Sequence, residues 1–512
     1  MKVLIIALCA VVYMAAASPL EKRLGVPIQA EDDCNPKIGA KNFSTDATDC
    51  QVFYICDHGW PKIRRCPGDT IWTPALERCT DKYFAVNDEC RYEAPPTPAP
   101  VEIAPEDLDP AACYDPRNMC NGVIDCNNGE DEEGCAPICD PNACRLPDCK
   151  CSSPDAPGNL QSNEIPQLVM IGWDGALRVE DYNHLLQQIL KKVNAQRQRE
   201  PRRNPNGCPL TATFFTSHQF TDYAAVQSMY AEGNEIASFS ITKQLPSEYW
   251  AQASDAELSA EYAGQRAMFN RFSGIPASAI KGVRSAYLQT KGSDFVNLIK
   301  DDGFTWDSSY PTDKIDPPLW PYTFDYQSTG GCAIPPCPTS SISRMWEVPL
   351  VDWYDTNDTL CANVDSCYYP NDKAEALQLL RTNFDRHYKT NKAPFPINLR
   401  ARWFLNNGYY NMEALQQFLD EIQENRDVYF VTYSQLIEYM KNPVKLADVG
   451  RSEAFTCDFA GRTPLCAHPN LCGYFNISYA PNDEEHQGDR FFQTCVECPA
   501  VYPWVDNPLG EA

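Results

Sequence analysis

Aromatic side chains are crowded among six cysteines near the start of the chain, and they are the first candidates for binding a ligand. The cysteines have the spacing C-x15-C-x5-C-x9-C-x12-C-x10-C across residues 34–90. A block of this size cannot bury many large rings, so some of them must face water. Exposed flat rings stack on the faces of pyranose sugars, which predicts binding to a weakly charged polysaccharide. The favoured sugar contacts are Tyr54, Trp60 and Trp72, and a disulfide-stapled stability module without a ligand is the alternative.

Carboxylates and amides cluster in a second, smaller cysteine block, residues 113–135. Its last part, residues 120–135, has the sequence CNGVIDCNNGEDEEGC. Several oxygen ligands at short spacing suit a hard cation such as calcium. A block this small cannot own a hydrophobic core, so cross-links or a bound ion must hold it. An acidic, disulfide-stapled spacer is the alternative interpretation.

Imidazole ligands for a transition metal are scarce in the long region of ordinary globular composition that follows. Between residues 165 and 442 the histidines are His184, His218 and His387, and no two of them have metal-ligand spacing. The sequence therefore predicts no zinc site in this region.

Strands and helices must position any site in this region. The apolar runs at residues 167–173, 212–215 and 428–431 predict buried strands. Apolar residues recur at helical spacing in residues 185–193, where Val193 is the last of them, and again in residues 412–422. Alternating strands and helices favour a parallel α/β barrel or a doubly wound sheet.

The N-terminus has the features of a secretion signal. A basic residue, an apolar stretch and a small-residue exit predict a signal peptide over residues 1–17. A membrane anchor is the alternative, but it needs roughly 20 apolar residues and this run is shorter. Apart from Cys9 in the leader, 24 of the 25 cysteines lie in clusters, which in a secreted protein indicate disulfides. We therefore expect a soluble extracellular product without a membrane span.

The charge of the chain limits its partners. The formal net charge is -26 and the sequence pI is about 4.6. Nucleic acid and anionic membranes would repel such a chain, so neither is an expected partner. A neutral or cationic polymer would be tolerated or attracted, and solubility of a secreted protein is the alternative reason for the acidity.

The two small blocks resemble known extracellular modules, with a Pro-rich linker, residues 94–110, between them. Residues 34–90, with the run CPGDTIW, resemble the peritrophin-type (type 2) chitin-binding domain, which implies chitin as the ligand. Residues 113–135 resemble a truncated low-density-lipoprotein-receptor class A repeat, with four cysteines where the family has six. The implied disulfides are Cys34 with Cys56, Cys50 with Cys90, Cys66 with Cys79, Cys113 with Cys126, and Cys120 with Cys135. The implied calcium ligands are Asn121, which stands where the family has Asp, Asp125, Asp131 and Glu132.

The rest of the chain resembles arthropod chitin deacetylases of the polysaccharide deacetylase (NodB-like) superfamily. The resemblance rests on the runs NPNGCP at 204–209, ATFF at 212–215, PLWPYT at 318–323, IPPCP at 334–338 and CVECP at 495–499. It implies a distorted (β/α) barrel over residues 139–442, with a groove at the strand ends, and a Cys-rich extension over residues 443–512. Family members hold zinc with one Asp and two His, and they use a second Asp as base and another His as acid.

Matched position by position, the resemblance implies a rewritten catalytic site. Asp174 keeps the base position and Arg284 keeps the groove arginine. The three metal-ligand positions and the acid position hold, in order, Gly175, Phe239, Lys243 and Arg400. Glycine, phenyl and ammonium groups offer no lone pair, and arginine stays protonated. We expect Lys243 or Arg400 within about 6 Å of the Asp174 carboxylate as a replacement counter-ion, the alternative being that both point to solvent.

The sequence thus predicts a multidomain chitin-binding protein whose deacetylase domain is a pseudoenzyme that helps to organise an extracellular chitin matrix of cuticle, trachea or gut lining. An active chitin deacetylase with an atypical site, and a protein scaffold built on the receptor-like repeat, are the alternatives. Chitin is the expected partner, and partially deacetylated chitin and matrix proteins are further candidates. Sequons at Asn42, Asn357 and Asn476 predict N-glycosylation.

Overall fold

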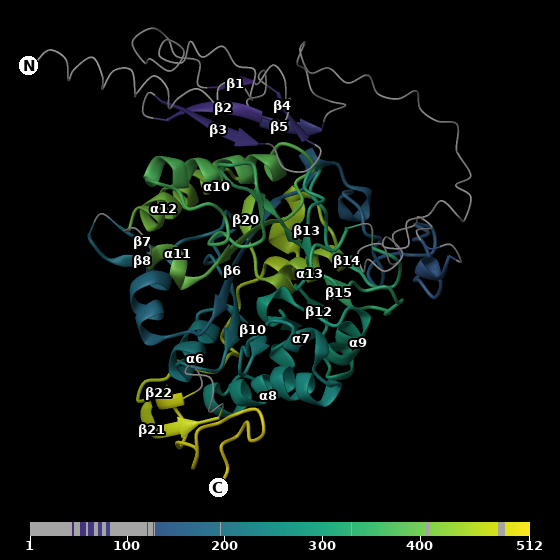
Figure 1. Ribbon diagram of the computed structural model, residues 1–512. Coiled ribbons are helices and arrows are strands. Elements are labelled where there is room, and N and C mark those ends of the chain that lie inside the picture. The colour runs from purple at the N-terminus through teal and green to yellow at the C-terminus, as the bar shows by residue number, and fades with distance from the viewer. Residues whose placement is uncertain are drawn as a thin grey trace, which may run out of the picture. The chain divides into compact units, whose positions relative to one another are not determined.

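The computed structural model describes two parts of the chain, which divides into the compact units Met1–Ile103 and Ala104–Ala512 (Figure 1). In the first unit it describes the backbone of five strands between residues 43 and 81. In the second it describes residues 120, 126, 129–194, 196–328, 330–405, 409–479 and 487–512. The predicted signal peptide, the linker and Asn42 lie outside these residues. So do the side chains of Tyr54, Trp60 and Trp72, the predicted cross-links of residues 34–90, Cys113, and the predicted calcium ligands Asn121 and Asp125.

The first unit contains two small antiparallel sheets. One has the order β1-β2-β3 and the other pairs β4 with β5. The favoured sugar contacts fall on three of these strands: Tyr54 on β2, Trp60 on β3 and Trp72 on β4. The strand bounds are β1 Phe43–Thr45, β2 Val52–Asp57, β3 Trp60–Arg65, β4 Thr70–Thr73 and β5 Arg78–Asp81.

The second unit is built on one curled sheet of nine strands in the order β14-β15-β12-β11-β10-β9-β6-β19, with β20 also paired to β6. All neighbours are parallel except β14 and β15. In the described part of the chain the two end strands of this order do not pair, so the predicted barrel is an open, curled one. The bounds are β6 Gln167–Gly175, β9 Thr213–Ser217, β10 Glu235–Ser240, β11 Gly282–Val283, β12 Trp306–Asp307, β14 Tyr322–Thr323, β15 Trp346–Glu347, β19 Phe395–Leu399 and β20 Val428–Phe430.

The helices lie between and around these strands, as a parallel sheet requires. The bounds are α5 Gln187–Leu190, α6 Tyr223–Ala231, α7 Tyr249–Gln252, α8 Asp255–Ser273, α9 Ser293–Asp301, α10 Lys373–Tyr388, α11 Ala401–Leu405, α12 Tyr410–Ile422 and α13 Tyr433–Lys441. A π-helical segment, Asp181–Leu186, precedes α5. The prediction that Val193 continues this helical face is wrong, because Val193 ends strand β7 and is exposed.

Alternation along β6 divides the core into two clusters. Val169, Ile171 and Trp173 belong to the larger cluster, which also contains helix residues. Leu168 and Met170 belong to a second cluster on the other face of the sheet. Because side chains alternate along a strand, Asp174 points to the same face as Leu168 and Met170.

Short strand pairs and disulfides complete the second unit. The remaining strands are β7 Lys191–Val193, β8 Arg199–Pro201, β13 Pro311–Thr312, β16 Leu350–Val351, β17 Trp353–Tyr354, β18 Leu360–Cys361, β21 Asn470–Ser478 and β22 Gln487–Thr494. The described disulfides are Cys120–Cys135, Cys139–Cys151, Cys144–Cys149, Cys208–Cys457, Cys332–Cys337, Cys361–Cys367, Cys466–Cys495 and Cys472–Cys498. Cys208–Cys457 ties the C-terminal extension to the sheet domain across 249 residues.

Candidate functional site

Asp174, the aspartate at the predicted base position, lies near the end of β6 and is almost fully enclosed. Its side chain is 1% exposed. One carboxylate oxygen, Oδ1, accepts a hydrogen bond of 2.6 Å from Nη1 of Arg284, which follows β11. The other oxygen, Oδ2, is buried and accepts no hydrogen bond from any residue that the structure describes. The carboxylate is therefore neutralised by an ion pair and shielded from bulk water.

Arg284 is fully buried and uses its whole guanidinium. Nε donates to the carbonyl of Ser308 at 2.9 Å, and Nη2 donates to Ser308 Oγ at 3.0 Å and to the Tyr433 hydroxyl at 2.9 Å. Nη1 also reaches Asn398 Oδ1 at 3.3 Å, and the guanidinium carbon lies 3.7 Å from the centroid of the Phe215 ring. Burial opposes the charge of Arg284, but Asp174 and the hydrogen bonds outweigh it and raise the pKa of the guanidinium.

The predicted replacement counter-ions do not pair with Asp174. The Nη1 atom of Arg400 lies 3.7 Å from Oδ2 of Asp365 instead. The ammonium group of Lys243 lies 5.4 Å from the centroid of the Phe239 ring and 6.0 Å from that of Tyr287. In the described part of the chain the cation that pairs with Asp174 is Arg284, the retained groove arginine. The approach of Lys243 or Arg400 to within about 6 Å of the Asp174 carboxylate stays a prediction.

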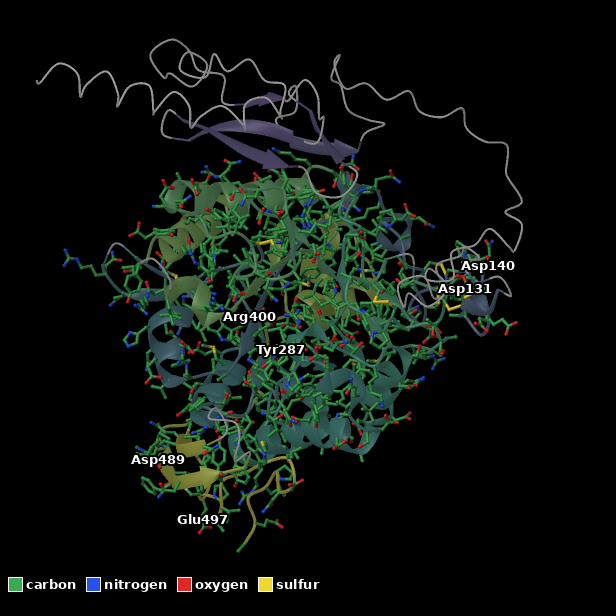
Figure 2. The ribbon with its side chains drawn as sticks, viewed as in Figure 1. Asp131, Asp140, Tyr287, Arg400, Asp489 and Glu497 are labelled. Carbon is green, nitrogen blue, oxygen red and sulfur yellow. A yellow bond between two sulfur atoms is a disulfide. The ribbon has the colours of Figure 1, made fainter. Side chains whose placement is uncertain are left out.

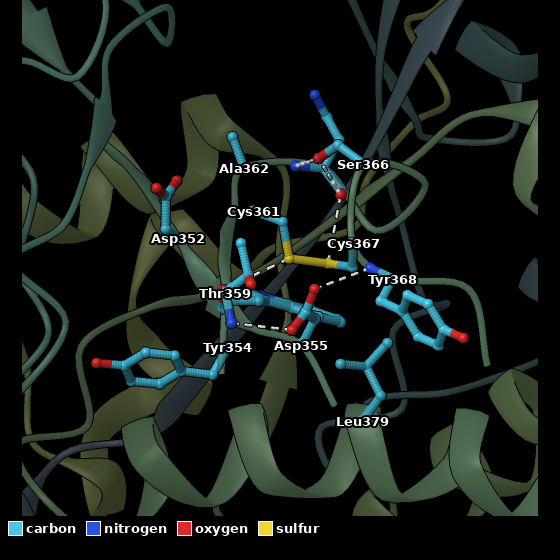
Figure 3. The surroundings of a disulfide bond; sticks show 12 residues. Asp352, Tyr354, Asp355, Thr359, Cys361, Ala362, Ser366, Cys367, Tyr368 and Leu379 are labelled. Carbon is cyan, nitrogen blue, oxygen red and sulfur yellow. Dashed lines mark hydrogen bonds between the residues drawn. A yellow bond between two sulfur atoms is a disulfide. The ribbon is translucent and has the colours of Figure 1, made fainter. Parts of the chain in front are cut away.

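Asp365 is a site residue that sequence reasoning missed. It lies in the loop closed by the Cys361–Cys367 disulfide, whose surroundings are drawn in Figure 3. Asp355 braces this loop by accepting hydrogen bonds from the backbone N–H groups of Thr359 and Tyr368. Burial raises the pKa of Asp365, the charge of Arg400 lowers it, and that of Asp174 raises it again. The two closely spaced cysteines were the available signal that this loop is rigid.

Lys243 is held in place by its backbone. Its φ of 50° lies in the left-handed region, and its carbonyl accepts a hydrogen bond of 2.9 Å from the Tyr287 hydroxyl. The buried carboxylate of Glu261, on α8, accepts hydrogen bonds from the N–H groups of Ile241 and Thr242 just before it. Tyr287 and Arg400 are labelled near the middle of the domain in Figure 2. The loop that carries Lys243 is thus fixed by other elements.

A pocket of about 330 Å³ opens beside this loop. Its walls come from residues that follow β6, β9, β10 and β11, and from β22 of the C-terminal extension. They include Ser217, Phe220, Thr242, Lys243, Tyr287 and Arg490. Phe220 is half exposed, and the guanidinium of Arg490 lies 4.5 Å from its ring centroid. The pocket therefore offers an aromatic face with polar groups around it.

The residues at the predicted metal-ligand positions do not fit a divalent cation. Phe239 is buried hydrocarbon at the end of β10, and Lys243 carries a positive charge. At Gly175, whose φ is 122°, an added Cβ would meet no heavy atom within 4 Å, so space exists there but a ligand does not. Among the described residues, the one convergent group of three potential ligands is Cys139, Cys144 and Cys151, and all three are in disulfides.

Two buried acidic residues that contact each other, Asp307 and Glu347, were not predicted from the sequence. Asp307 on β12 and Glu347 on β15 are direct neighbours in the sheet register, and both are fully buried. Burial raises the pKa of Asp307 to about 6. Burial, with the adjacent Asp307, raises the pKa of Glu347 well above its ordinary value. Burial thus favours the protonated form of Glu347 beside Asp307.

The small repeat before the sheet domain is described in part. A disulfide joins Cys120 to Cys135. Asp131, labelled in Figure 2, is fully buried within the 3-10 helix Glu130–Glu132, and its Oδ1 accepts a hydrogen bond of 3.0 Å from the backbone N–H of Cys126. Glu132 is part-buried and faces the Cys135 sulfur. One of the two described candidate calcium ligands thus points inward.

The curled parallel sheet with an aspartate–arginine pair at its strand ends defines a domain of the polysaccharide deacetylase type. Residues 34–90 match the family described as "Chitin binding Peritrophin-A domain". Chitin deacetylase 8 of Bombyx mori is 36% identical over 381 residues, which are 73% of this chain and 93% of that protein. Chitin deacetylase 1 of Bombyx mori is 33% identical over 424 residues, 78% of this chain and 75% of that protein. The chain belongs to the chitin deacetylase family.

Among solved structures, the family 4 carbohydrate esterase from Streptomyces lividans in complex with acetate is similar with a TM-score of 0.28 and 13% identity, covering 52% of this chain and 92% of that one. Every helix in the described ranges is too short or too polar to cross a membrane.

Proposed function

We propose that this chain is an extracellular chitin-binding member of the family whose deacetylase domain does not hydrolyse N-acetyl groups and instead helps to organise chitin. The observation that carries this proposal is the state of Asp174. Its carboxylate is paired with Arg284 at 2.6 Å and its side chain is 1% exposed. None of the groups at the matched metal and acid positions can complete the reaction.

Amide hydrolysis needs an activated water, a polarised carbonyl and a proton donor for the leaving amine. Glycine, phenyl and ammonium groups at positions 175, 239 and 243 cannot ligate a cation, so no Lewis acid would be held there. Arg400 offers a guanidinium at the acid position, and this group is not a proton donor for a departing amine. Of the catalytic groups, the base alone remains, and it is enclosed.

Chitin binding rests on the matched front module. Tyr54, Trp60 and Trp72 are the proposed sugar contacts, because planar aromatic rings suit pyranose faces. The pocket with Phe220 and Tyr287 at its wall supports a second, weaker contact of the sheet domain with sugar, including partially deacetylated chitin. Matrix proteins are the other proposed partners.

The test compares binding and turnover on the secreted full-length chain. We expect the protein to sediment with insoluble chitin, to release no acetate from chitin oligomers, and to contain no zinc after dialysis. The variant Trp60→Ala/Trp72→Ala should stay in the supernatant, whereas the matched site variant Asp174→Asn should sediment like the wild type. Acetate release that disappears in Asp174→Asn would establish the alternative, an active deacetylase with an atypical site.

Secretion is the proposed location, into the matrix of cuticle, trachea or gut lining. The signal-like N-terminus and the eight described disulfides support it, because disulfides persist in oxidising compartments. Asn357 and Asn476 are exposed, as N-glycosylation at their sequons requires. Mass spectrometry after glycosidase treatment would show whether these sites carry glycans.

Calcium in the small repeat remains a proposal that rests on Asp131. Asp131 is fully buried and accepts a hydrogen bond from the backbone N–H of Cys126, and carboxylate oxygens of this kind are the ligands that calcium prefers. Calcium addition should raise the thermal stability of the full chain, and Asp131→Asn should abolish that gain. An equal response in the two proteins would leave the acidic-spacer interpretation standing.

A further inference from the structure

The hairpin β7–β8 carries a concentration of positive charge on a strongly acidic protein. Strands Lys191–Val193 and Arg199–Pro201 pair antiparallel and lie at the margin of the domain in Figure 1. Lys192, Arg197 and Arg199 are exposed. None of the three forms an ion pair with a residue in the described ranges, although acidic residues outnumber basic ones by 69 to 43 in the chain.

The hairpin is rigidly anchored by other residues, so these three cations are not needed to hold it. At its base Lys191 pairs with Glu232 at 3.2 Å, and the nearly buried Arg202 pairs with Asp420 on α12. At its turn the side chain of Asn194 accepts hydrogen bonds from the backbone N–H groups of Gln196 and Gln198, at 3.0 and 2.9 Å. The positive side chains are therefore presented on a fixed frame.

The hairpin also has strand edges that pair with no further strand among the described residues. The bonds from Asn194 N–H to the Gln198 carbonyl and from Arg202 N–H to the Leu190 carbonyl fix the ladder. In an antiparallel ladder, hydrogen-bonded and non-hydrogen-bonded pairs alternate, so the backbone groups of Val193 and Arg199 point outward. Val193 is 64% exposed, and these two strands form a sheet of their own among the described residues. An extended peptide can pair with the β7 edge, whereas the outward side of β8 includes Pro201, which has no backbone N–H to donate.

The hairpin carries one acidic residue of its own. Glu200 lies directly opposite Lys192 in the register. Lys192, Arg197 and Arg199 together still leave an excess of positive charge on the hairpin.

We propose that the β7–β8 hairpin docks an acidic, extended polypeptide segment, which pairs with a strand edge and places its carboxylates against Lys192, Arg197 and Arg199. Guanidinium groups match carboxylates in two-pronged geometry, and strand addition gives a peptide backbone contacts that a glycan cannot make. The proposal is independent of the chitin-binding function, since none of these residues lies in the front module or beside Asp174.

The test measures binding of the full-length protein to a 12-residue peptide that alternates glutamate and threonine. We expect Lys192→Gln/Arg197→Gln/Arg199→Gln to weaken binding by about tenfold and to leave the circular dichroism spectrum and the thermal midpoint unchanged. The matched control Arg271→Gln/Lys300→Gln/Arg426→Gln removes three exposed charges elsewhere and should stay within about twofold of the wild type.

A second probe separates strand pairing from charge alone. The same peptide with N-methyl groups on alternate residues keeps its charges but cannot pair along one edge, so it should bind more weakly than the unmodified peptide. Equal binding of the two peptides, equal loss in the control variant, or tighter binding of a heparin oligosaccharide than of the peptide would each overturn the proposal. The last result would assign the hairpin to an anionic glycan.

Discussion

Asp174 and the pair Asp307 and Glu347 are buried acidic residues of the same curled sheet. Their negative charges are compensated in different ways. Asp174 is paired with Arg284, which is held by Ser308, Tyr433 and Asn398 and has no second carboxylate partner within the described ranges. Asp307 and Glu347 lie on neighbouring strands with a hydroxyl and a backbone N–H as donors to their outer oxygens. The first pair is ionic, whereas in the second burial raises the pKa of both carboxyl groups and favours their protonated forms.

The difference explains how the sheet tolerates the lost metal positions. A buried negative charge is costly unless a cation or a proton offsets it. Arg284 already neutralises Asp174, so the groove floor does not depend on a bound dication for its folding. At Asp307 and Glu347 no ion pair forms among the described residues, and burial favours the protonated carboxyl instead. The two pairs should therefore respond oppositely to mutation and to pH.

Removal of Arg284 should produce the largest effect. Arg284→Met leaves Asp174 buried without a counter-charge, and we expect the free energy of unfolding to fall by about 3–5 kcal/mol. Urea denaturation of the full chain, followed by tryptophan fluorescence, measures this loss. The double variant Asp174→Leu/Arg284→Met removes both charges and should recover much of the stability. If the double variant is as unstable as the single one, the ion pair is not what stabilises this region.

The acidic pair Asp307 and Glu347 should give the next largest effect, seen in how the free energy of unfolding depends on pH. The raised pKa values of Asp307, about 6, and of Glu347 mean that the pair contributes fully below pH 4 and that this contribution is lost as pH rises through 6 and beyond. Glu347→Gln keeps a neutral donor beside Asp307, so the decline in unfolding free energy between pH 6.5 and 8.5 should flatten, by about 1–3 kcal/mol.

The pH window is chosen because buried histidines act in the opposite direction at lower pH. Burial lowers the pKa values of His218 and His387 to about 3. Their contribution therefore grows as pH rises towards 6.5 and is complete above it. Exposed Glu424→Gln is the matched control and should leave the wild-type slope intact. If the unfolding free energy of Glu347→Gln declines with pH as steeply as that of the control, titration of Glu347 does not cause the decline.

The sequence predicted much of the Asp174 region because local patterns encode it. The apolar runs at 167–173, 212–215 and 428–431 correspond to β6, β9 and β20. Asp174 follows the first run directly, and a family motif marked Arg284. The pairing of Asp174 with Arg284 was not predicted, because one-dimensional spacing does not say which cation reaches across 110 residues to a buried carboxylate.

The Asp307–Glu347 pair could not be predicted, for a physical reason. Each acid belongs to a two-residue strand, too short for any alternation to show which face it occupies. Their contact depends on the order of strands in the sheet, in which β12 pairs directly with β15 although β13 and β14 lie between them in the sequence. The prediction for Val193 was wrong for a related reason. The helical spacing of apolar residues continues to Val193, but the helix ends at Leu190 and Val193 belongs to strand β7.

Replacement of Arg400 should have the smallest effect. It tests whether partial exposure to water makes the Arg400–Asp365 ion pair weaker than the buried Arg284–Asp174 pair. Its side chain is 38% exposed and lies 3.7 Å from Asp365, compared with the fully buried 2.6 Å contact of Arg284. Arg400→Gln should therefore lower the free energy of unfolding by less than about 1 kcal/mol, and Arg400→Lys by less still.

The variant Arg400→His sharpens the same contrast chemically, because it restores an imidazole at the acid position while positions 175, 239 and 243 remain without ligands. It should release no acetate from chitin oligomers, since a proton donor cannot act before a water has been activated. Acetate release from Arg400→His, absent in Arg400→Gln, would show that the enclosed Asp174 still works as a base, and that the ion pair with Arg284 opens when substrate binds.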